Sequence, residues 1–171
     1  MSRRDLKKYT TELTKEQLEE QILELYDKFG DVKVYYDFVF NPNEDKLVRE
    51  AKIKISNEYF PVGRKKSKMR RTVAQKYIKH FITLGVDTYL IADLMLFTIE
   101  IAQTYSSEKV VKQELFFKSM LASFKQAISF LIQHGVLAEF QNRVAAIKDQ
   151  TVHQNWFNQY EFDAIIERFE Y

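Results

Sequence analysis

The stretch TVAQKYIKHFITLGVD, residues 72–87, contains one complete amphipathic helix, its stop signal and the start of another helix. Its apolar residues recur at intervals of four, four and three positions, the period of an α-helix with one buried face: Val73, Tyr77, Phe81 and Leu84. Gly85 follows at once, in the place where a left-handed residue ends many helices. Asp87 can then cap the first turn of a following helix. The stretch therefore predicts two consecutive helices joined by a short turn.

The same pattern of stripes and breakers runs along the whole chain. The 171 residues include four glycines and two prolines, and Gly30, Gly85 and Gly135 each follow an apolar run with helical spacing. Thr14 and Gln17 form a capping box ahead of one such run, and the longest run is expected to start near Ser107. Most connections are short, which favours antiparallel neighbours. The sequence therefore predicts an all-α fold, an irregular multi-helix bundle of about eight helices.

One segment is ambiguous between helix and strand. VKVYYDFVF, residues 32–40, is rich in the β-branched and aromatic residues that strands favour. Asp31 as a helix cap and the lack of a pairing partner favour a short helix, and a strand is the alternative.

The domain organisation follows from length and from one long break. A chain of 171 residues fits a single all-α domain, residues 1–171. The loop over residues 61–71 also allows a division into an N-terminal helical unit, residues 1–60, and a helical bundle, residues 72–171.

Composition favours a cytoplasmic protein without a membrane partner. The chain has no cysteine, which excludes disulfides and Cys-based zinc sites and fits a reducing compartment. The N-terminal stretch MSRRDLKKYTTEL is charged from its third residue, so we expect no secretory signal. The most apolar stretch, residues 89–102, contains Asp93 and Glu100 and is shorter than the roughly 20 residues of a membrane span.

Positive charge is concentrated in one place. The net charge is only +2, yet the 28 residues from Tyr59 to Val86 contain eight Lys or Arg residues and no Asp or Glu. The stretch GRKKSKMRR, residues 63–71, holds six of them and leads into the helix of residues 72–84. The free N–H groups of a helix N-terminus favour an anion. The candidate anion-binding residues are Arg64, Lys65, Lys66, Lys68, Arg70, Arg71, Lys76 and Lys79.

Three interpretations of this basic segment remain open. It is a solvated loop that keeps the protein soluble, a contact for nucleic acid or another polyanion through phosphates, or a contact for an acidic protein partner. The long acid-free window favours a functional surface, whereas the absence of a familiar nucleic-acid-binding signature counts against it.

Catalytic and metal-binding motifs are missing from the sequence. There is no nucleophile elbow and no glycine-rich phosphate loop, and we expect no metal, no cofactor and no catalytic residue. Asp93 and Glu100 lie seven residues apart and share a helix face. They are expected to lie at a solvated edge or to pair with a basic side chain, because metal sites in helical bundles use Glu-x-x-His motifs that this chain lacks.

Four stretches carry a resemblance to a known family. They are RDLKKYTTELTKEQLEEQILELYDKF, YYDFVFNPNEDKL, RRTVAQKYIKHFITLGVD and YLIADLMLFTIEIAQTYS. They resemble a family of uncharacterised bacterial proteins, a domain of unknown function, and the likeness weakens after about Gln150. The resemblance implies a small bacterial cytoplasmic protein and assigns no activity or site residue.

The sequence thus favours a non-enzymatic binding protein. Its leading function is binding of nucleic acid or another polyanion through the basic loop and the following helix N-terminus. The alternative is a protein–protein interaction adaptor or small homo-oligomer that uses apolar helical surface. An enzyme with an unrecognised site is the third interpretation.

Overall fold

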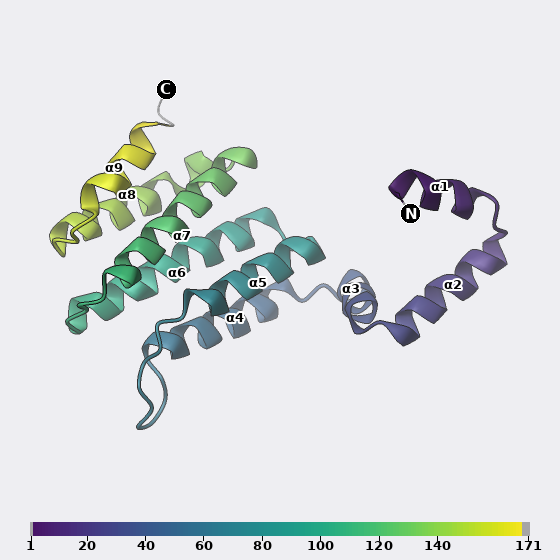
Figure 1. Ribbon diagram of the computed structural model, residues 1–171, viewed down its shortest axis with the longest axis horizontal. Helices are drawn as coiled ribbons and strands as arrows, with labels where there is room; N and C mark the ends of the chain where they lie inside the picture. The colour runs from purple at the N-terminus through teal and green to yellow at the C-terminus, as the bar shows by residue number, and fades with distance from the viewer. Residues whose placement is uncertain (1, 169–171) are drawn as a thin grey trace. The chain divides into compact units, whose positions relative to one another are not determined.

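The computed structural model describes residues 2–168, and every regular element within that range is an α-helix. The predicted all-α bundle is confirmed, with nine helices in the described range instead of about eight. The helices are α1 (Arg3–Thr11), α2 (Lys15–Lys28), α3 (Gly30–Phe40), α4 (Glu44–Tyr59), α5 (Arg71–Leu84), α6 (Thr88–Glu108), α7 (Glu114–Gln133), α8 (Leu137–His153) and α9 (Gln159–Glu167) (Figure 1).

Two differences from the predicted elements have local causes. The additional helix is α1, which begins with a capping box in which the Ser2 and Asp5 side chains each accept the other's backbone N–H. The helix expected from near Ser107 begins only at Glu114, because α6 continues to Glu108 and Lys109 then turns extended (φ −130°, ψ 133°). The ambiguous residues 32–40 lie in α3, so the strand alternative is wrong.

The sequence predicted that Gly30, Gly85 and Gly135 each end a helix, and this is confirmed for Gly85 and Gly135. Gly85 and Gly135 have φ values of 77° and 69°, the left-handed region that a side chain with a Cβ adopts at a cost. Gly30 instead begins α3, because Phe29 has already ended α2 by turning extended (φ −122°, ψ 111°).

The chain divides into two compact units. Unit 1, Met1–Asn43, contains α1 to α3, and unit 2, Glu44–Tyr171, contains α4 to α9. The division lies after residue 43 and not in the loop of residues 61–71, which joins two helices of unit 2. The sequence grouped α4 with the N-terminal helices, whereas α4 packs against α5 and α6.

The core of unit 2 is built around α6, which contacts α4, α5, α7 and α8. Figure 1 shows these helices side by side, with α9 against α7 and α8. Leu94, Leu96 and Ile99 on α6 are fully buried. Burying one such side chain contributes roughly 1.5–3 kcal/mol. The core therefore fixes the positions of the loops that join successive helices from α4 to α9.

Aromatic rings attach α9 and the turn before it to α7. Trp156 is 2% exposed and its ring lies 5.9 Å from the ring of Phe116 and 5.2 Å from that of Phe117. Further along, the rings of Phe124 and Phe162 lie 4.9 Å apart, and both side chains are fully buried. These edge-to-face and tilted contacts are the geometries that aromatic pairs prefer.

Within the described residues, α7 is the one helix long and apolar enough to span a membrane by length and composition. It is also a core helix of unit 2, since residues along its length are buried against its neighbours. Core helices satisfy the same two criteria. Its buried residues are Phe116, Met120, Ser123, Phe124, Ala127, Ile128, Phe130 and Leu131.

Candidate functional site

The cationic loop, residues 61–70, connects α4 to α5 and is closed at its base by Glu58. The carbonyl oxygen of Glu58 accepts the N–H groups of Lys68 and Met69, both at 2.9 Å. Its carboxylate accepts hydrogen bonds from Arg70, with Nε at 2.8 Å and Nη2 at 2.7 Å. A bidentate contact of this kind is the stronger form of an arginine–carboxylate pair. One residue therefore holds the returning limb of the loop against α4, and the tip projects beyond the helices (Figure 1).

Glu58 is a residue of the candidate site that the sequence analysis did not identify. The acid-free window begins at Tyr59, so Glu58 lies one residue outside it. The hydrogen bond from Arg70 holds the pKa of Glu58 below its ordinary value, which keeps the carboxylate ionised at neutral pH. The positive charge of Arg70 is thus matched by a negative one, and the side chain of Glu58 is only 12% exposed.

A second anchor ties the same limb to α6. The Ser67 hydroxyl lies 2.7 Å from the hydroxyl of Tyr105, within hydrogen-bond distance. Met69 has a φ of 51°, a left-handed conformation that turns the chain toward α5. Residues 67–70 are therefore fixed to α4 and α6, whereas residues 62–66 form an exposed tip.

Four of the predicted anion-binding residues line one cavity. Lys65, Lys66, Lys68 and Arg70 surround a volume of about 260 Å³ between the loop and the end of α4. Glu58 is the acidic residue among those lining it, so four positive charges and one negative charge leave a net charge of +3. This space is called the loop cavity below. Arg64 is exposed at the tip and does not line it.

Arg71, the first residue of α5, points away from the loop cavity. Its Nε donates to Ser123 Oγ at 2.7 Å and its Nη2 donates to Gln126 Oε1 at 3.1 Å, both on α7. Partial burial lowers the pKa of Arg71. Its hydrogen-bond partners in the described chain are neutral, so the guanidinium carries a positive charge that no carboxylate there balances.

A second cavity of about 450 Å³ adjoins the first. Lys68 and Arg70 line both, and Arg71 and Thr72 line the second at the N-terminus of α5. Its other wall is the start of α7, where Leu115 is 77% exposed. Arg70 and Gln113, the residues before α5 and α7, make no side-chain cap, so backbone N–H groups remain at both helix starts.

Lys76 and Lys79 lie on the solvent side of α5. The buried residues of this helix are Ala74, Ile78, Phe81 and Leu84, and both lysines are exposed. They line neither the loop cavity nor the adjoining one. The eight predicted residues thus lie in four places, which are the loop cavity, the exposed tip with Arg64, the side of α7 contacted by Arg71 and the outer face of α5.

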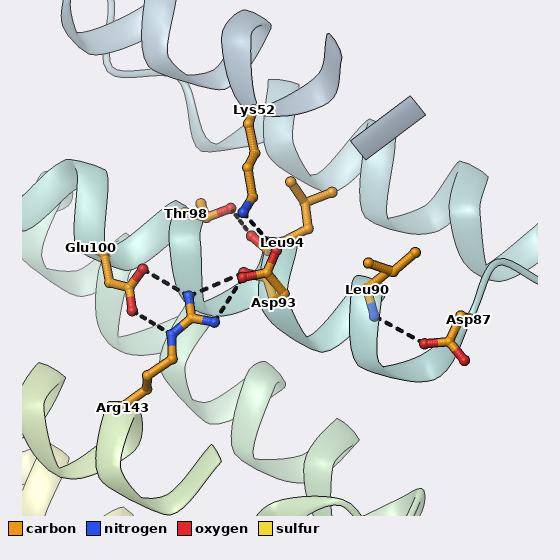
Figure 2. A network of polar contacts seen from close by, with 8 residues as sticks. All are labelled: Lys52, Asp87, Leu90, Asp93, Leu94, Thr98, Glu100 and Arg143. Carbon is orange, nitrogen blue, oxygen red and sulfur yellow. Dashed lines mark hydrogen bonds and ion pairs between the residues drawn. The ribbon is translucent and has the colours of Figure 1, made fainter. Parts of the chain in front are cut away.

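The carboxylates of Asp93 and Glu100 are held by one arginine, as Figure 2 shows. Arg143 on α8 contacts Asp93 Oδ1 through Nη1 at 2.7 Å and Glu100 through Nε and Nη2, both at 2.8 Å. Lys52 on α4 lies 2.6 Å from Asp93 Oδ2. The predicted pairing with a basic side chain is confirmed, and the network joins α4, α6 and α8.

The charges of this network favour its ionised form. Burial raises the pKa of Asp93, but hydrogen bonds from Lys52 and Arg143 outweigh burial and leave the pKa below its ordinary value. The hydrogen bonds that Arg143 donates to Glu100 raise the pKa of Arg143. The four charges balance as two positive and two negative, which is the arrangement of a structural ion-pair network. Among residues 2–168 there is no group of three or more Asp, Glu, His or Cys residues arranged to hold a metal ion.

One protein-family model matches almost the whole chain. Residues 1–170 match the model of DUF6155, a family of unknown function. The chain belongs to the DUF6155 family. The sequence predicted a weaker likeness after about Gln150, whereas the match continues to residue 170 and so includes both units. Searches of curated proteins and of solved structures returned no match.

Proposed function

We propose that this DUF6155 protein is a non-enzymatic binding protein whose cationic loop binds the phosphate groups of nucleic acid. The observation that carries the proposal is the loop cavity, where four cations surround about 260 Å³ and one carboxylate opposes them. A net charge of +3 on the residues that line one small volume attracts a phosphate group.

The lysines of the cavity are available to a ligand. Lys65, Lys66 and Lys68 are exposed and take part in no ion pair within residues 2–168, so binding a phosphate breaks no existing pair there. Lysine binds phosphate as a point charge and needs no fixed planar geometry. A mobile phosphate backbone is a suitable ligand for such groups.

The spread of charge favours a chain of phosphates over a single one. Lys68 and Arg70 border both cavities, and the second cavity adds the unbalanced guanidinium of Arg71. Lys76 and Lys79 add charge on the outer face of α5. Contacts to phosphates position a nucleic acid without reading its bases, so the binding we propose is independent of sequence.

A titration with a single-stranded oligonucleotide at two salt concentrations tests the proposal. The variant combines Lys65→Gln, Lys66→Gln and Lys68→Gln. The matched control combines Lys54→Gln, Lys109→Gln and Lys112→Gln, three exposed lysines outside both cavities. Both variants lose three positive charges. We expect the loop variant alone to bind at least about tenfold more weakly, with a log–log salt slope less negative by about 2, since each contact contributes about 0.7.

Two outcomes contradict the proposal. Equal affinities of the two variants would show that total charge and not the loop cavity determines binding. Tighter binding of heparin than of the oligonucleotide, in the wild-type chain, would show that the loop is a general polyanion site and that nucleic acid is not the preferred ligand.

A further inference from the structure

The second cavity differs from the loop cavity in size. Its volume is about 450 Å³, against about 260 Å³ for the loop cavity. Pockets that hold organic ligands are typically about 300–1,000 Å³, so the second cavity lies within this range and the loop cavity lies below it. The second cavity is lined by Lys68, Met69, Arg70, Arg71, Thr72, Gln113, Leu115, Phe116 and Ser119.

The wall of the second cavity at the start of α7 carries no charge. It consists of Gln113, Leu115, Phe116 and Ser119. Leu115 is 77% exposed, so its isobutyl group meets water in the single chain. These side chains offer a phosphate no positive charge, whereas the flat face of an organic ring buries apolar area against them. The wall at α7 therefore favours an uncharged ring over a further phosphate.

The opposite wall contains two guanidinium groups whose planes are fixed. Arg70 donates two hydrogen bonds to the carboxylate of Glu58, at 2.8 and 2.7 Å. Arg71 donates to Ser123 Oγ at 2.7 Å and to Gln126 Oε1 at 3.1 Å. Two hydrogen bonds from one planar group restrict its rotation, so each plane is held before a ligand arrives. Unstacked bases pack on arginine planes as they do on aromatic rings.

One polar side chain of the second cavity suits the edge of a base. Gln113, the residue before α7, is exposed and its side chain does not cap the helix. An amide carries both a donor and an acceptor, and unpaired bases form hydrogen bonds through edges that carry both. The amide can also turn over, so it matches the edges of different bases.

Given the phosphate binding proposed above, on which this inference rests, we propose that the second cavity takes one unpaired base of the same strand. The preferred ligand is then single-stranded nucleic acid. Lys68 and Arg70 line both cavities, so a group in the second cavity is the immediate neighbour of a phosphate in the loop cavity. In a single strand that neighbour is a base on its sugar. In a duplex the bases are paired and stacked inside, and the phosphates alone reach the protein.

A strand without bases separates base binding from phosphate binding. Oligothymidylate and an abasic strand of the same length carry the same number of phosphates. We expect the wild-type full chain to bind oligothymidylate about fivefold more tightly than the abasic strand, the lower end of one stacking contact. The ratio of the two affinities should change little between two salt concentrations, because salt acts on the phosphate contacts that both strands share.

Truncation of Leu115 tests the second cavity itself. Leu115→Ala should lower the ratio of the two affinities to less than about twofold, because less apolar area is then buried against the base. Its affinity for the abasic strand should equal that of the wild type. Val110→Ala is the matched control, since Val110 is 88% exposed and lines neither cavity. Both side chains are exposed, so neither truncation should change the stability of the fold.

An introduced tryptophan provides a second measurement. Leu115→Trp places an indole ring in the wall of the second cavity, where a stacked base should quench its fluorescence. The quenching should appear with oligothymidylate and not with the abasic strand. The single native tryptophan, Trp156, is 2% exposed and gives a constant background. Val110→Trp should respond to neither strand.

The possible failures of this inference and of the proposed function are distinguishable. Equal affinities of the wild type for the two strands would overturn the base site and leave the phosphate binding intact. A full ratio retained in Leu115→Ala, with no quenching in Leu115→Trp, would overturn it by placing the base elsewhere. Absence of binding to either strand would contradict the proposed function, and the base site with it.

Discussion

Units 1 and 2 are built from the same kind of amphipathic helix but differ in what covers the apolar faces. All 30 buried apolar side chains of the described residues lie in unit 2, although unit 1 contributes three of the nine helices. In unit 2, the single helix α6 contacts four other helices, α4, α5, α7 and α8. In unit 1 the main helix contact is that of α2 with α3.

The difference shows that a helical pattern and a helix partner are separate properties of a sequence. Periodicity and caps determine where a helix forms, and both units have them. Most helical stability in proteins comes from packing of the apolar face. Unit 2 therefore has a core of its own, whereas the helices of unit 1 contain no buried residue.

Matched phenylalanine truncations in the two units should show the largest effect. Phe124→Ala removes a fully buried ring from unit 2 and should lower the free energy of unfolding by about 3–5 kcal/mol. Phe40→Ala removes a ring that is 75% exposed in unit 1 and should change it by less than about 1 kcal/mol. Urea denaturation of both variants measures the contrast. Similar losses would mean that unit 1 has a core that its exposed side chains do not reveal.

Breaking an ion pair should likewise lower the free energy of unfolding more in unit 2 than in unit 1. Arg143→Met leaves the partly buried carboxylate of Glu100 without its arginine and weakens the hold on Asp93, so we expect a loss of about 2 kcal/mol. Lys28→Met removes an exposed pair with Glu24 within α2, where we expect about 0.3–0.5 kcal/mol or less. Thermal and urea unfolding of both variants compare them. A larger loss for Lys28→Met would contradict the distinction between the units.

The pH dependence of unfolding should report the network of unit 2. The folded-state pKa of Asp93 is below its unfolded value, so its stabilising contribution is present above about pH 4 and is lost as the pH falls through the lowered folded-state pKa. Asp93→Asn should therefore flatten the acid limb of the stability curve. Equal curves for Asp93→Asn and the wild type would show that the network does not couple to protonation.

Local features of the fold were predictable because they depend on neighbouring residues. The helix stop at Gly85 and the cap at Asp87 act within a few residues, and the structure contains both. The predicted stripe is correct at Phe81 and Leu84, whereas the buried face continues through Ala74 and Ile78 and leaves Val73 and Tyr77 half-buried. Gly30 was misread because an extended Phe29 ends α2 without needing a left-handed residue. For Asp93 and Glu100 the sequence left two expectations, a solvated edge and a pair with a basic side chain, and the structure contains the pair, which offsets the cost of partly burying the carboxylates.

Features that depend on distant contacts were not predictable from this one sequence. Nothing local shows that Arg143, 50 residues from Asp93, is the shared partner. The direction of Arg71 toward Ser123 on α7 likewise depends on how two helices pack. Glu58 had a signal, its place one residue before the acid-free window, but charge counting within the window omitted it. The eight candidate cations are close together in the sequence, yet packing divides them among the loop cavity, the exposed tip, the side of α7 and the outer face of α5.

The smallest expected effect concerns the exposed loop of unit 2, which resembles unit 1 in being a surface without a core. Glu58→Gln removes the one negative charge of the loop cavity and changes its net charge from +3 to +4. We expect oligonucleotide affinity at low salt to rise roughly two- to fivefold, the effect of one charge a few ångströms away in water. Glu50→Gln changes an exposed residue of the same helix by the same charge and is the matched control. An equal rise for both would show that binding responds to total charge. A lower affinity of Glu58→Gln would show that the ion pair between Glu58 and Arg70 orders the loop. The order of the loop would then matter more for binding than its net charge.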